Sequence, residues 1–429
     1  EVFPFTVVSL DYIKSDVRRE QFKSTCPNFV IVDEAHTCTS LGQAGHGRKQ
    51  QRHQLVRELS VDPDRHMLFV TATPHSGNEH GFRSLLELVN PDFGSLPDDL
   101  GGEANRAKRE ELARYFVQRR RVHIRDYLRT DTQFPERLEK EETYTLGDSE
   151  YRKLFSRLLK YARETVRDSE GMKKARQRVR WWAALGLLRA LASSPAAAAA
   201  TLRSKASAVD ALTPEQVDEI SRPLVLDEDI DESEDVLDYM PGADTTGLDD
   251  DDEDAQRERR RLLEMARAAE ELEGDGDPKL QAATRIVKGL LKQKTRPILF
   301  CRFIATAEYL AEQLREALPN KVVVQCITGK IPATEREKRI DELVGLDECV
   351  LVCTDCLSEG INLQHVFDAV VHYDLSWNPT RHEQREGRVD RFGQVAEEVF
   401  VVTFYGVDNQ IDGVVLEVLI RKHKAIRKA

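Results

Sequence analysis

The sequence predicts an α/β protein of two parallel-sheet lobes, the first incomplete, separated by a helical insertion. Short apolar runs alternate with amphipathic stretches at both ends of the 429-residue chain, and this alternation is typical of parallel α/β layers. Between residues 135 and 276 the strand pattern disappears and helical periodicity replaces it. We therefore expect the first lobe in residues 1–134, the insertion in 135–276 and the second lobe in 277–429.

The first lobe is expected to contain few strands. Its apolar runs predict strands at 6–10, 29–32 and 67–71, and its amphipathic stretches predict helices at 51–59 and 81–89. Three strands are few for a doubly wound sheet, and the chain begins with Glu1 rather than Met. We therefore expect the sequence to be a piece of a longer protein.

The second lobe has a fuller series of apolar runs. They predict strands at 298–301, 321–327, 350–354, 369–373 and 399–404. Amphipathic helices are expected between them, at 306–317, 334–344 and 382–390. This series predicts a compact α/β lobe of normal size.

The insertion is predicted to be helical. Residues 149–192 have a strong helical pattern, which Pro195 and the following alanines interrupt, and 213–215 carry a helix-start signal. A charged helix is expected at 254–272. Residues 227–254 hold 15 Asp or Glu among 28 positions and no Lys or Arg, so we expect a disordered surface segment there.

Composition excludes several classes of protein. No apolar run approaches the ~18 to 20 residues of a membrane span, and seven scattered cysteines do not suggest a disulfide scaffold. A reducing cytosol is the expected compartment. The net charge of −12 depends on the acidic segment, because the rest of the chain has 63 basic and 60 acidic residues. Basic patches elsewhere can therefore bind a polyanion.

The sharpest motif is the run 29–36, in which an apolar strand ends in Asp33-Glu34-Ala35-His36. Its carboxylates fall at the carboxyl end of a strand, where α/β folds bind ligands. Asp33 can hold a hydrated Mg²⁺ that bridges nucleotide phosphates, and Glu34 can polarise an attacking water. The structural alternative is a strand that ends in an acidic helix cap.

Two further segments follow strands and carry hydroxyl groups. In the run 67–75, Thr71 and Thr73 can hydrogen-bond the acidic pair, although the segment alone indicates only a strand that stops at a proline. Past the strand at 350–354, Thr354 and Ser358 can hold a phosphate or relay to a nucleotide. Trp377 is interpreted as a packing anchor.

The run 384–391 is the third motif. On a helix, Gln384, Gly387, Arg388 and Arg391 share one face by three- and four-residue spacing. Two guanidinium groups on that face suit a γ-phosphate, whereas the structural alternative is a solvated charged helix. Glycine destabilises a helix, so Gly387 requires an explanation, and close approach to a ligand or to the other lobe would provide one.

Cysteines and histidines do not form a convincing metal site in the sequence. Cys353 and Cys356 have metal-like spacing, but no second pair of suitable separation accompanies them. We interpret the cysteines as buried small apolar residues. The histidines at 36, 75 and 372 are interpreted as motif or core residues.

Taken in order, these blocks resemble the superfamily 2 helicases and translocases, and within them the Swi/Snf-like class. The matching blocks are VIVDEAH, TATPHSGN, ILFCRFIATAEYLAEQL, CTDCLSEGINLQ and DLSWNPTRHEQREGRVDRFGQ, which with their surroundings cover roughly 270 of the 429 residues. The W-N-P triplet and the D-R-F-G-Q ending favour this class over DEAD-box RNA helicases. Among bacterial members the chain looks most like those that associate with RNA polymerase or belong to phage-defence systems.

The resemblance implies two RecA-like lobes with ATP and Mg²⁺ in the cleft between them, and movement along duplex DNA. It implies catalytic roles for Asp33, Glu34, Arg388 and Arg391, with Asp33 holding Mg²⁺ through water. The nucleotide-binding residues would be His36, Gln384, Gly387 and Gly360. Those that couple the sites or contact nucleic acid would be Thr71, Ala72, Thr73, Thr354, Ser358 and Asn362. RNA polymerase or phage-defence subunits are the implied partners.

One departure from the family pattern is large. The phosphate loop G-x-x-x-x-G-K-[ST] is absent, because Gly329-Lys330 is followed by Ile331 and the glycine-rich run 42–49 comes after the acidic pair. A missing N-terminal stretch explains the absence best, and we expect this chain alone not to hydrolyse ATP efficiently. A non-hydrolysing nucleic-acid-binding scaffold and an RNA helicase remain the alternative functions.

Overall fold

The computed structural model describes residues 5–14, 16–40, 48–72, 79–97, 100–118, 134–167, 174–207, 253–357 and 361–428. The chain divides into two compact units. Unit 1 comprises Glu1–Arg129 with Arg421–Ala429, and unit 2 comprises Thr130–Ile420. In the described part of the chain, no helix is long and apolar enough to cross a membrane.

Unit 1 contains a two-stranded parallel sheet. Its strands are β1 (Phe29–Val32) and β2 (His66–Phe69). Its helices are α1 (Leu10–Ile13), α2 (Asp16–Thr25), α3 (Arg48–Ser60), α4 (Glu79–Val89) and α5 (Arg106–Leu112), and its 3-10 helices are η1 (Ala35–Cys38), η2 (Pro91–Ser95) and η3 (Glu103–Asn105). The predicted strand at 6–10 is wrong. Residues 5–9 form no regular element and α1 begins at Leu10.

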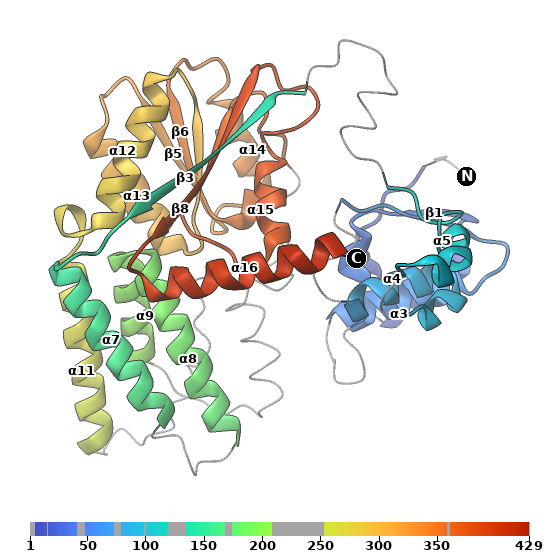
Figure 1. Ribbon diagram of the computed structural model, residues 1–429, viewed down its shortest axis with the longest axis horizontal. Coiled ribbons are helices and arrows are strands. Elements are labelled where there is room, and N and C mark those ends of the chain that lie inside the picture. The colour runs from blue at the N-terminus through green and yellow to red at the C-terminus, as the bar shows by residue number, and fades with distance from the viewer. Residues whose placement is uncertain are drawn as a thin grey trace. The chain divides into compact units, whose positions relative to one another are not determined.

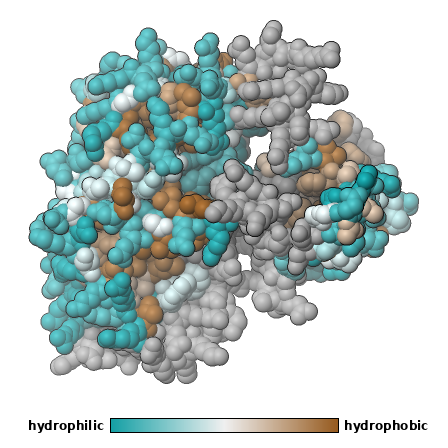
Figure 2. All heavy atoms as spheres, in the orientation of Figure 1, coloured by the Kyte–Doolittle hydropathy of each residue, from teal (hydrophilic) through white to brown (hydrophobic). Residues whose placement is uncertain are grey.

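The two faces of the sheet in unit 1 differ. One face packs against α3 and α4 through Val32, Val56, Leu85 and Leu88. On the other face the alternate residues Phe29, Ile31, Leu68 and Val70 are exposed, and Figure 2 shows hydrophobic residues at the surface there. Parallel sheets are ordinarily covered on both faces, so this small sheet has an unusually apolar exposed side.

Unit 2 is built on a six-stranded, all-parallel sheet in the order β3-β8-β7-β4-β6-β5, which confirms the α/β class. The strands are β3 (Glu136–Tyr144), β4 (Pro297–Phe300), β5 (Val323–Ile327), β6 (Cys349–Cys353), β7 (Ala369–His372) and β8 (Glu398–Gly406). The five strands predicted for the second lobe are confirmed to within a few residues.

The helices of unit 2 cover both faces of this sheet and extend beyond one end of it (Figure 1). They are α7 (Glu150–Arg167), α8 (Lys174–Ser193), α9 (Pro195–Ser207), α11 (Glu253–Glu270), α12 (Pro278–Lys292), α13 (Ile304–Ala317), α14 (Ala333–Asp341), α15 (Pro379–Glu386) and the part of α16 (Gln410–Lys428) up to Ile420, with 3-10 helices η4 (Gly274–Gly276) and η5 (Asp355–Leu357). The helices α7, α8, α9 and α11 form what we call the helical layer. It shares one large core with α12, α13 and one face of the sheet, whereas α14 packs on the opposite face.

The expectation that strands are absent from 135–276 is wrong, because β3 lies in that range. Within the described part of the chain, this strand forms the edge of the sheet and pairs only with β8. Most of its side chains face solvent, so its sequence, ERLEKEETY, contains no apolar run. Charged side chains on an edge strand commonly protect a protein against aggregation. Because such a strand lacks an apolar run, a sequence pattern for buried strands does not detect it.

The predicted interruption at Pro195 is confirmed, because α8 ends at Ser193 and Pro195 begins a new helix, but the alanines continue that helix, α9, rather than extending the break. Proline at the first helical position needs no amide partner, and the Ser194 hydroxyl accepts a hydrogen bond of 3.0 Å from the Ala197 amide. Alanine is the best helix former. The charged helix predicted at 254–272 corresponds to α11, while the helix start at 213–215 and residues 227–252 of the acidic segment lie outside the described residues.

Candidate functional site

The acidic pair lies directly after β1. Asp33 is exposed, and its Oδ1 accepts a hydrogen bond of 2.9 Å from the Glu34 amide. Glu34 has a φ of 47°, a left-handed conformation that is rare outside glycine and marks functional or strained positions. The turn ends β1 and begins η1, and it places both carboxylates at the carboxyl end of the parallel pair.

The loops that follow β1 and β2 are tied together. His36 is buried, and its Nδ1 lies 3.2 Å from Glu34 Oε2 and 3.0 Å from Thr71 Oγ1. The amide of Ala35 also donates to the carbonyl of Val70 at 3.0 Å. His36 therefore links Thr71 to Glu34, a member of the acidic pair. Ala72 is exposed beside it, while Thr73 and His75 lie outside the described residues.

In unit 2 the segment after β6 is held by a buried arginine. Arg385 is fully buried, and its guanidinium binds Asp355 with two hydrogen bonds, Nε to Oδ1 at 2.6 Å and Nη2 to Oδ2 at 3.0 Å. Burial disfavours the Asp355 anion, but the charge and hydrogen bonds of Arg385 outweigh this effect and lower the pKa of the carboxyl. Thr354, just before it, is buried and donates its amide to the Ile327 carbonyl at 3.3 Å.

The two predicted motif segments of unit 2 contact each other. Arg388 Nη1 donates to the carbonyl of Ile361 at 3.3 Å, and Arg391 Nη1 donates to Asn362 Oδ1 at 3.0 Å. Both Arg391 and Asn362 are exposed, whereas Arg388 is half-buried. Ser358 and Gly360, which precede Ile361 in the sequence, lie outside the described residues. The sequence segments around 361 and 388 are therefore neighbours in space.

The prediction of one continuous helix face at 384–391 is wrong. Helix α15 ends at Glu386, so Gly387 caps it and both arginines of the motif follow the helix. A Cβ at position 387 would lie 3.1 Å from the Glu383 carbonyl oxygen, which is tighter than an ordinary contact. The nearest atoms that a side chain would meet there thus belong to the last turn of the same helix. Gln384 is half-buried on α15.

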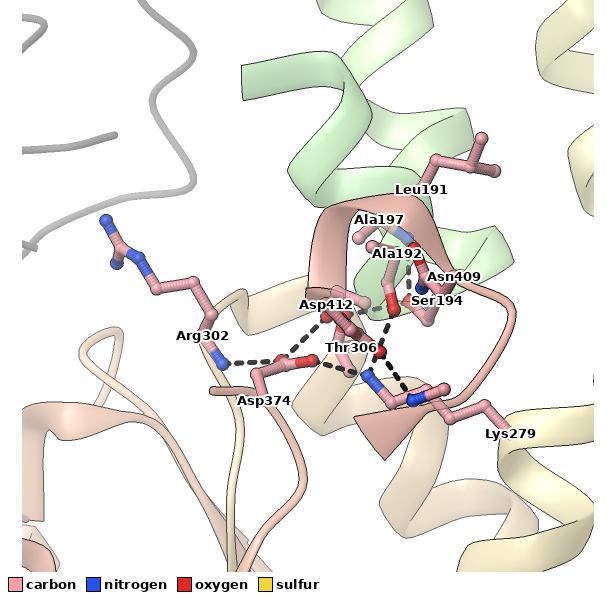
Figure 3. A network of polar contacts seen from close by, with 12 residues as sticks. Leu191, Ala192, Ser194, Ala197, Lys279, Arg302, Thr306, Asp374, Asn409 and Asp412 are labelled. Atoms are coloured by element: carbon pink, nitrogen blue, oxygen red, sulfur yellow. Dashed lines mark hydrogen bonds and ion pairs between the residues drawn. The ribbon is translucent and has the colours of Figure 1, made fainter. Parts of the chain in front are cut away.

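A buried polar network lies at the carboxyl ends of β4 and β7 (Figure 3). Arg302 and Asp374 fall within two of the quoted sequence blocks, but neither was predicted as a site residue. The Asp374 carboxylate accepts hydrogen bonds from Lys279 Nζ at 2.7 Å, from Ser193 Oγ at 2.7 Å and from the Arg302 amide at 2.8 Å. The Asp374 carbonyl accepts a further one from Arg385 Nη1 at 2.9 Å. Only the position of Asp374 between a strand and the W-N-P triplet could have drawn attention to it.

A second cluster, buried except for Arg137, joins β7, α15 and β3. His372 Nε2 lies 3.0 Å from Glu386 Oε1, Arg137 Nη1 lies 2.7 Å from Glu386 Oε2, and the His382 ring is 4.4 Å from the His372 ring. Burial lowers the pKa of both histidines well below the ordinary value. Imidazole and carboxylate groups can bind a transition metal, but the Glu386 oxygens and His382 Nε2, which accepts the Ser376 amide, are engaged within the protein. We interpret the cluster as a structural tie.

The cysteines agree in part with the interpretation as buried apolar residues. Cys38, Cys301, Cys349 and Cys353 are buried, whereas Cys26, Cys326 and Cys356 are half-buried. None of them belongs to a group of potential metal ligands among the described residues.

Parts of the chain are similar to known proteins. Residues 278–393 match the family described as "Helicase conserved C-terminal domain". The chain is 32% identical over 109 residues to the ATP-dependent RNA helicase fal1 of Schizosaccharomyces pombe, an alignment that covers 25% of this chain and 27% of that protein. The aligned segment thus spans about a quarter of the length of the curated relatives it matches.

Solved structures are more distant in sequence. The SWI2/SNF2 ATPase core of Sulfolobus solfataricus in complex with dsDNA aligns over 93% of this chain and 67% of that one, with 13% identity and a TM-score of 0.37. The Hef helicase domain of Pyrococcus furiosus aligns over 93% of this chain and 77% of that one, with 15% identity and a TM-score of 0.45.

Proposed function

We propose that this chain is part of an ATP-driven nucleic-acid motor of the Swi/Snf-like type, which couples ATP hydrolysis to movement on duplex DNA. The observation that carries the proposal is the contact between the segments 354–362 and 384–391, which unites Asp355 with Arg385, Ile361 with Arg388 and Asn362 with Arg391. These segments lie in the part of the chain that matches the helicase C-terminal family.

Asp33 and Glu34 would act on Mg²⁺ and water. The donor set fits this role, because both carboxylates reach solvent at the end of a parallel strand and Mg²⁺ prefers hard oxygen ligands. The metal would neutralise phosphate charge. Asp33 would hold it through water, and Glu34, oriented by His36, would accept the proton of the attacking water.

Arg388 and Arg391 would stabilise the charge that develops on the transferred phosphoryl group. Each donates to a neutral oxygen, the Ile361 carbonyl or the Asn362 amide. An anionic phosphate oxygen would bind either guanidinium more strongly than these neutral acceptors. Gln384 and Gly387, together with Gly360, would line the nucleotide, and His36 would contact it as well as Glu34.

Thr71, Ala72 and Thr73 would couple nucleotide state to the polymer, and Thr354, Ser358 and Asn362 would contact nucleic acid. Duplex DNA is favoured by the W-N-P triplet at 377–379 and by the D-R-F-G-Q ending at 390–394. An RNA helicase is the second candidate, because the curated relatives aligned with this chain are RNA helicases by name. RNA polymerase or phage-defence subunits as partners, and a bacterial cytosolic location, belong to the same proposal.

The test is the ATPase rate of the protein encoded by the complete reading frame, with duplex DNA, single-stranded DNA or RNA added. We expect stimulation by duplex DNA and its loss in Glu34→Gln. Glu58→Gln, which alters a carboxylate of α3 that pairs with Lys23, should leave the rate unchanged. Stimulation by RNA alone would support the second candidate. Binding of DNA without ATPase would support the scaffold alternative.

A further inference from the structure

We propose that the buried Lys279–Asp374 ion pair is a positioning device, which ties the helical layer of unit 2 to the arginine-bearing segment that follows α15. Lys279 and Asp374 are then positioning residues rather than catalytic ones, since neither is placed at a reacting atom. The proposal rests on the proposed function for its consequence in activity, but its structural part can be tested alone.

The pair is deeply buried. The Lys279 and Asp374 side chains are 4% and 8% exposed, and Nζ lies 2.7 Å from Oδ1. Removing one partner from such a pair leaves a buried charge uncompensated. Lys279 Nζ also donates to the Ala192 carbonyl at 3.0 Å, in the last turn of α8, and lies 4.3 Å from the centre of the Tyr373 ring. The ammonium group therefore stabilises the carboxyl end of α8 as well.

A second branch fixes the junction between α8 and α9. Ser193 Oγ donates to Asp374 Oδ2, and the hydroxyl of Thr306, in the first turn of α13, lies 2.7 Å from Ser193 Oγ and 2.8 Å from Ser194 Oγ. Ser194 in turn caps α9. The junction is thus attached by hydroxyl groups to α13 and to the end of β7 (Figure 3).

The main chain of Asp374 links this network to Arg385. Its carbonyl accepts a hydrogen bond from Arg385, whose other two guanidinium nitrogens hold Asp355. Asp355 begins η5, and Ile361 and Asn362, the partners of Arg388 and Arg391, follow it in the sequence. Arg385 itself lies three residues before Arg388 in the chain. A shift of the helical layer at Ser193 therefore moves the group that holds Arg385, through contiguous hydrogen bonds.

The first measurement is backbone hydrogen exchange in the complete protein, comparing wild type with Lys279→Met. We expect exchange at least about tenfold faster both at the α8–α9 junction and in residues 379–394, because local opening follows the contacts that are lost. The matched control is Asp368→Asn. Asp368 receives the Arg296 amide at 2.6 Å at the amino ends of the same two strands, and this variant should leave 379–394 unchanged.

The second measurement separates positioning from stability. We expect the double variant Lys279→Met/Asp374→Asn to recover most of the Tm that Lys279→Met loses, since no buried charge remains unpaired. The kcat of the stimulated ATPase should nevertheless stay about 10-fold to 100-fold below wild type, because misplacement of a positioned group slows the chemical step. Recovery of kcat together with Tm would show a merely structural role.

The two measurements distinguish failure of the proposed function from failure of the positioning proposal. Absence of ATPase in wild type overturns the proposed function, while exchange still decides whether the tie exists. If exchange becomes faster at the α8–α9 junction but is unchanged in residues 379–394, the positioning proposal is overturned, whatever the ATPase rate.

Discussion

At the scale of the residue, Lys205 is the clearest case of a charge that opposes folding. It lies in α9, and burial lowers its pKa to about 8 from an ordinary value of 10.5. Its Nζ has no hydrogen-bond partner among the described residues and lies 4.7 Å from the centre of the Tyr161 ring. Desolvation of the ammonium is therefore only partly compensated.

The sign of the pH dependence follows from this lowered pKa. Between pH 8 and 10.5 the unfolded chain binds a proton at Lys205 that the folded protein does not, so this residue makes stability rise with pH across that window. Below pH 8 the penalty is complete. We expect Lys205→Met to increase the free energy of unfolding by on the order of 2 kcal/mol at pH 7 and by much less at pH 10.5. Denaturant unfolding at both pH values measures it, and an equal gain at both would contradict desolvation of the ammonium as the cause.

Arg385 supports a second prediction at this scale. Lysine keeps the charge but cannot hold both oxygens of Asp355 and the Asp374 carbonyl at once. We expect Arg385→Lys to lower the free energy of unfolding by about 3 kcal/mol, as for other buried pairs that lose their geometry. Thermal unfolding of the variant measures the loss.

The matched control is Arg203→Lys. Arg203 makes the same two-pronged contact with Glu270, but on the surface, where solvent screens the pair. This variant should unfold at nearly the wild-type temperature. If the two variants lost equal stability, burial could not be the reason that Arg385 matters.

The candidate site shows what sequence can and cannot predict at this scale. The acidic pair, Arg388 and Arg391 could be named because their chemistry stands in short local motifs. Lys279, Asp374 and Ser193 could not, because they are far apart in the chain and become partners only through the fold. Arg385 lies within a predicted motif, but only its burial reveals that it holds the structure together.

At the scale of the element, α9 shows how packing reverses a sequence expectation. Ala197, Ala198 and Ala199 are buried, while Ala200 on the same helix is exposed. Alanines let α9 approach its neighbours closely, and Ala198 and Ala199 belong to the main core of unit 2. The alanine run that the sequence analysis read as an interruption is therefore a helix whose small side chains allow close packing. In the same way, the charged sequence of β3 fits a strand at an exposed edge of the sheet.

A pair of leucine substitutions tests this role of small side chains. Ala198→Leu should lower the free energy of unfolding by about 1 to 3 kcal/mol, because the core has no space for three more carbon atoms. Ala200→Leu should change it by less than about 0.5 kcal/mol. Both substitutions retain helix propensity, so a difference in chemical-denaturant midpoints reports packing alone. Equal midpoints would mean that the α9 contacts are loose.

At the scale of the whole molecule, the two units differ greatly in how much core supports them. Unit 2 has a six-stranded sheet with buried side chains on both faces. The described sheet of unit 1 has two strands of four residues, with Phe29, Ile31, Leu68 and Val70 exposed on one face. Two-stranded sheets are marginal by themselves. The sequence predicted few strands for this part of the chain, but it could not show which face of the sheet would be exposed.

We therefore expect calorimetry of this chain to resolve two thermal transitions, with unit 1 unfolding at the lower temperature. Val56→Ala, in the core of unit 1, should lower only the first transition, and Leu299→Ala, at a fully buried position in β4, only the second. Each deletes buried methyl groups at a cost of about 1 to 4 kcal/mol, which is enough to shift the transition of its own unit. A single transition that both substitutions lower equally would show that the units unfold as one cooperative body. In that case the exposed apolar face of unit 1 could not mark a separately weak part of the protein.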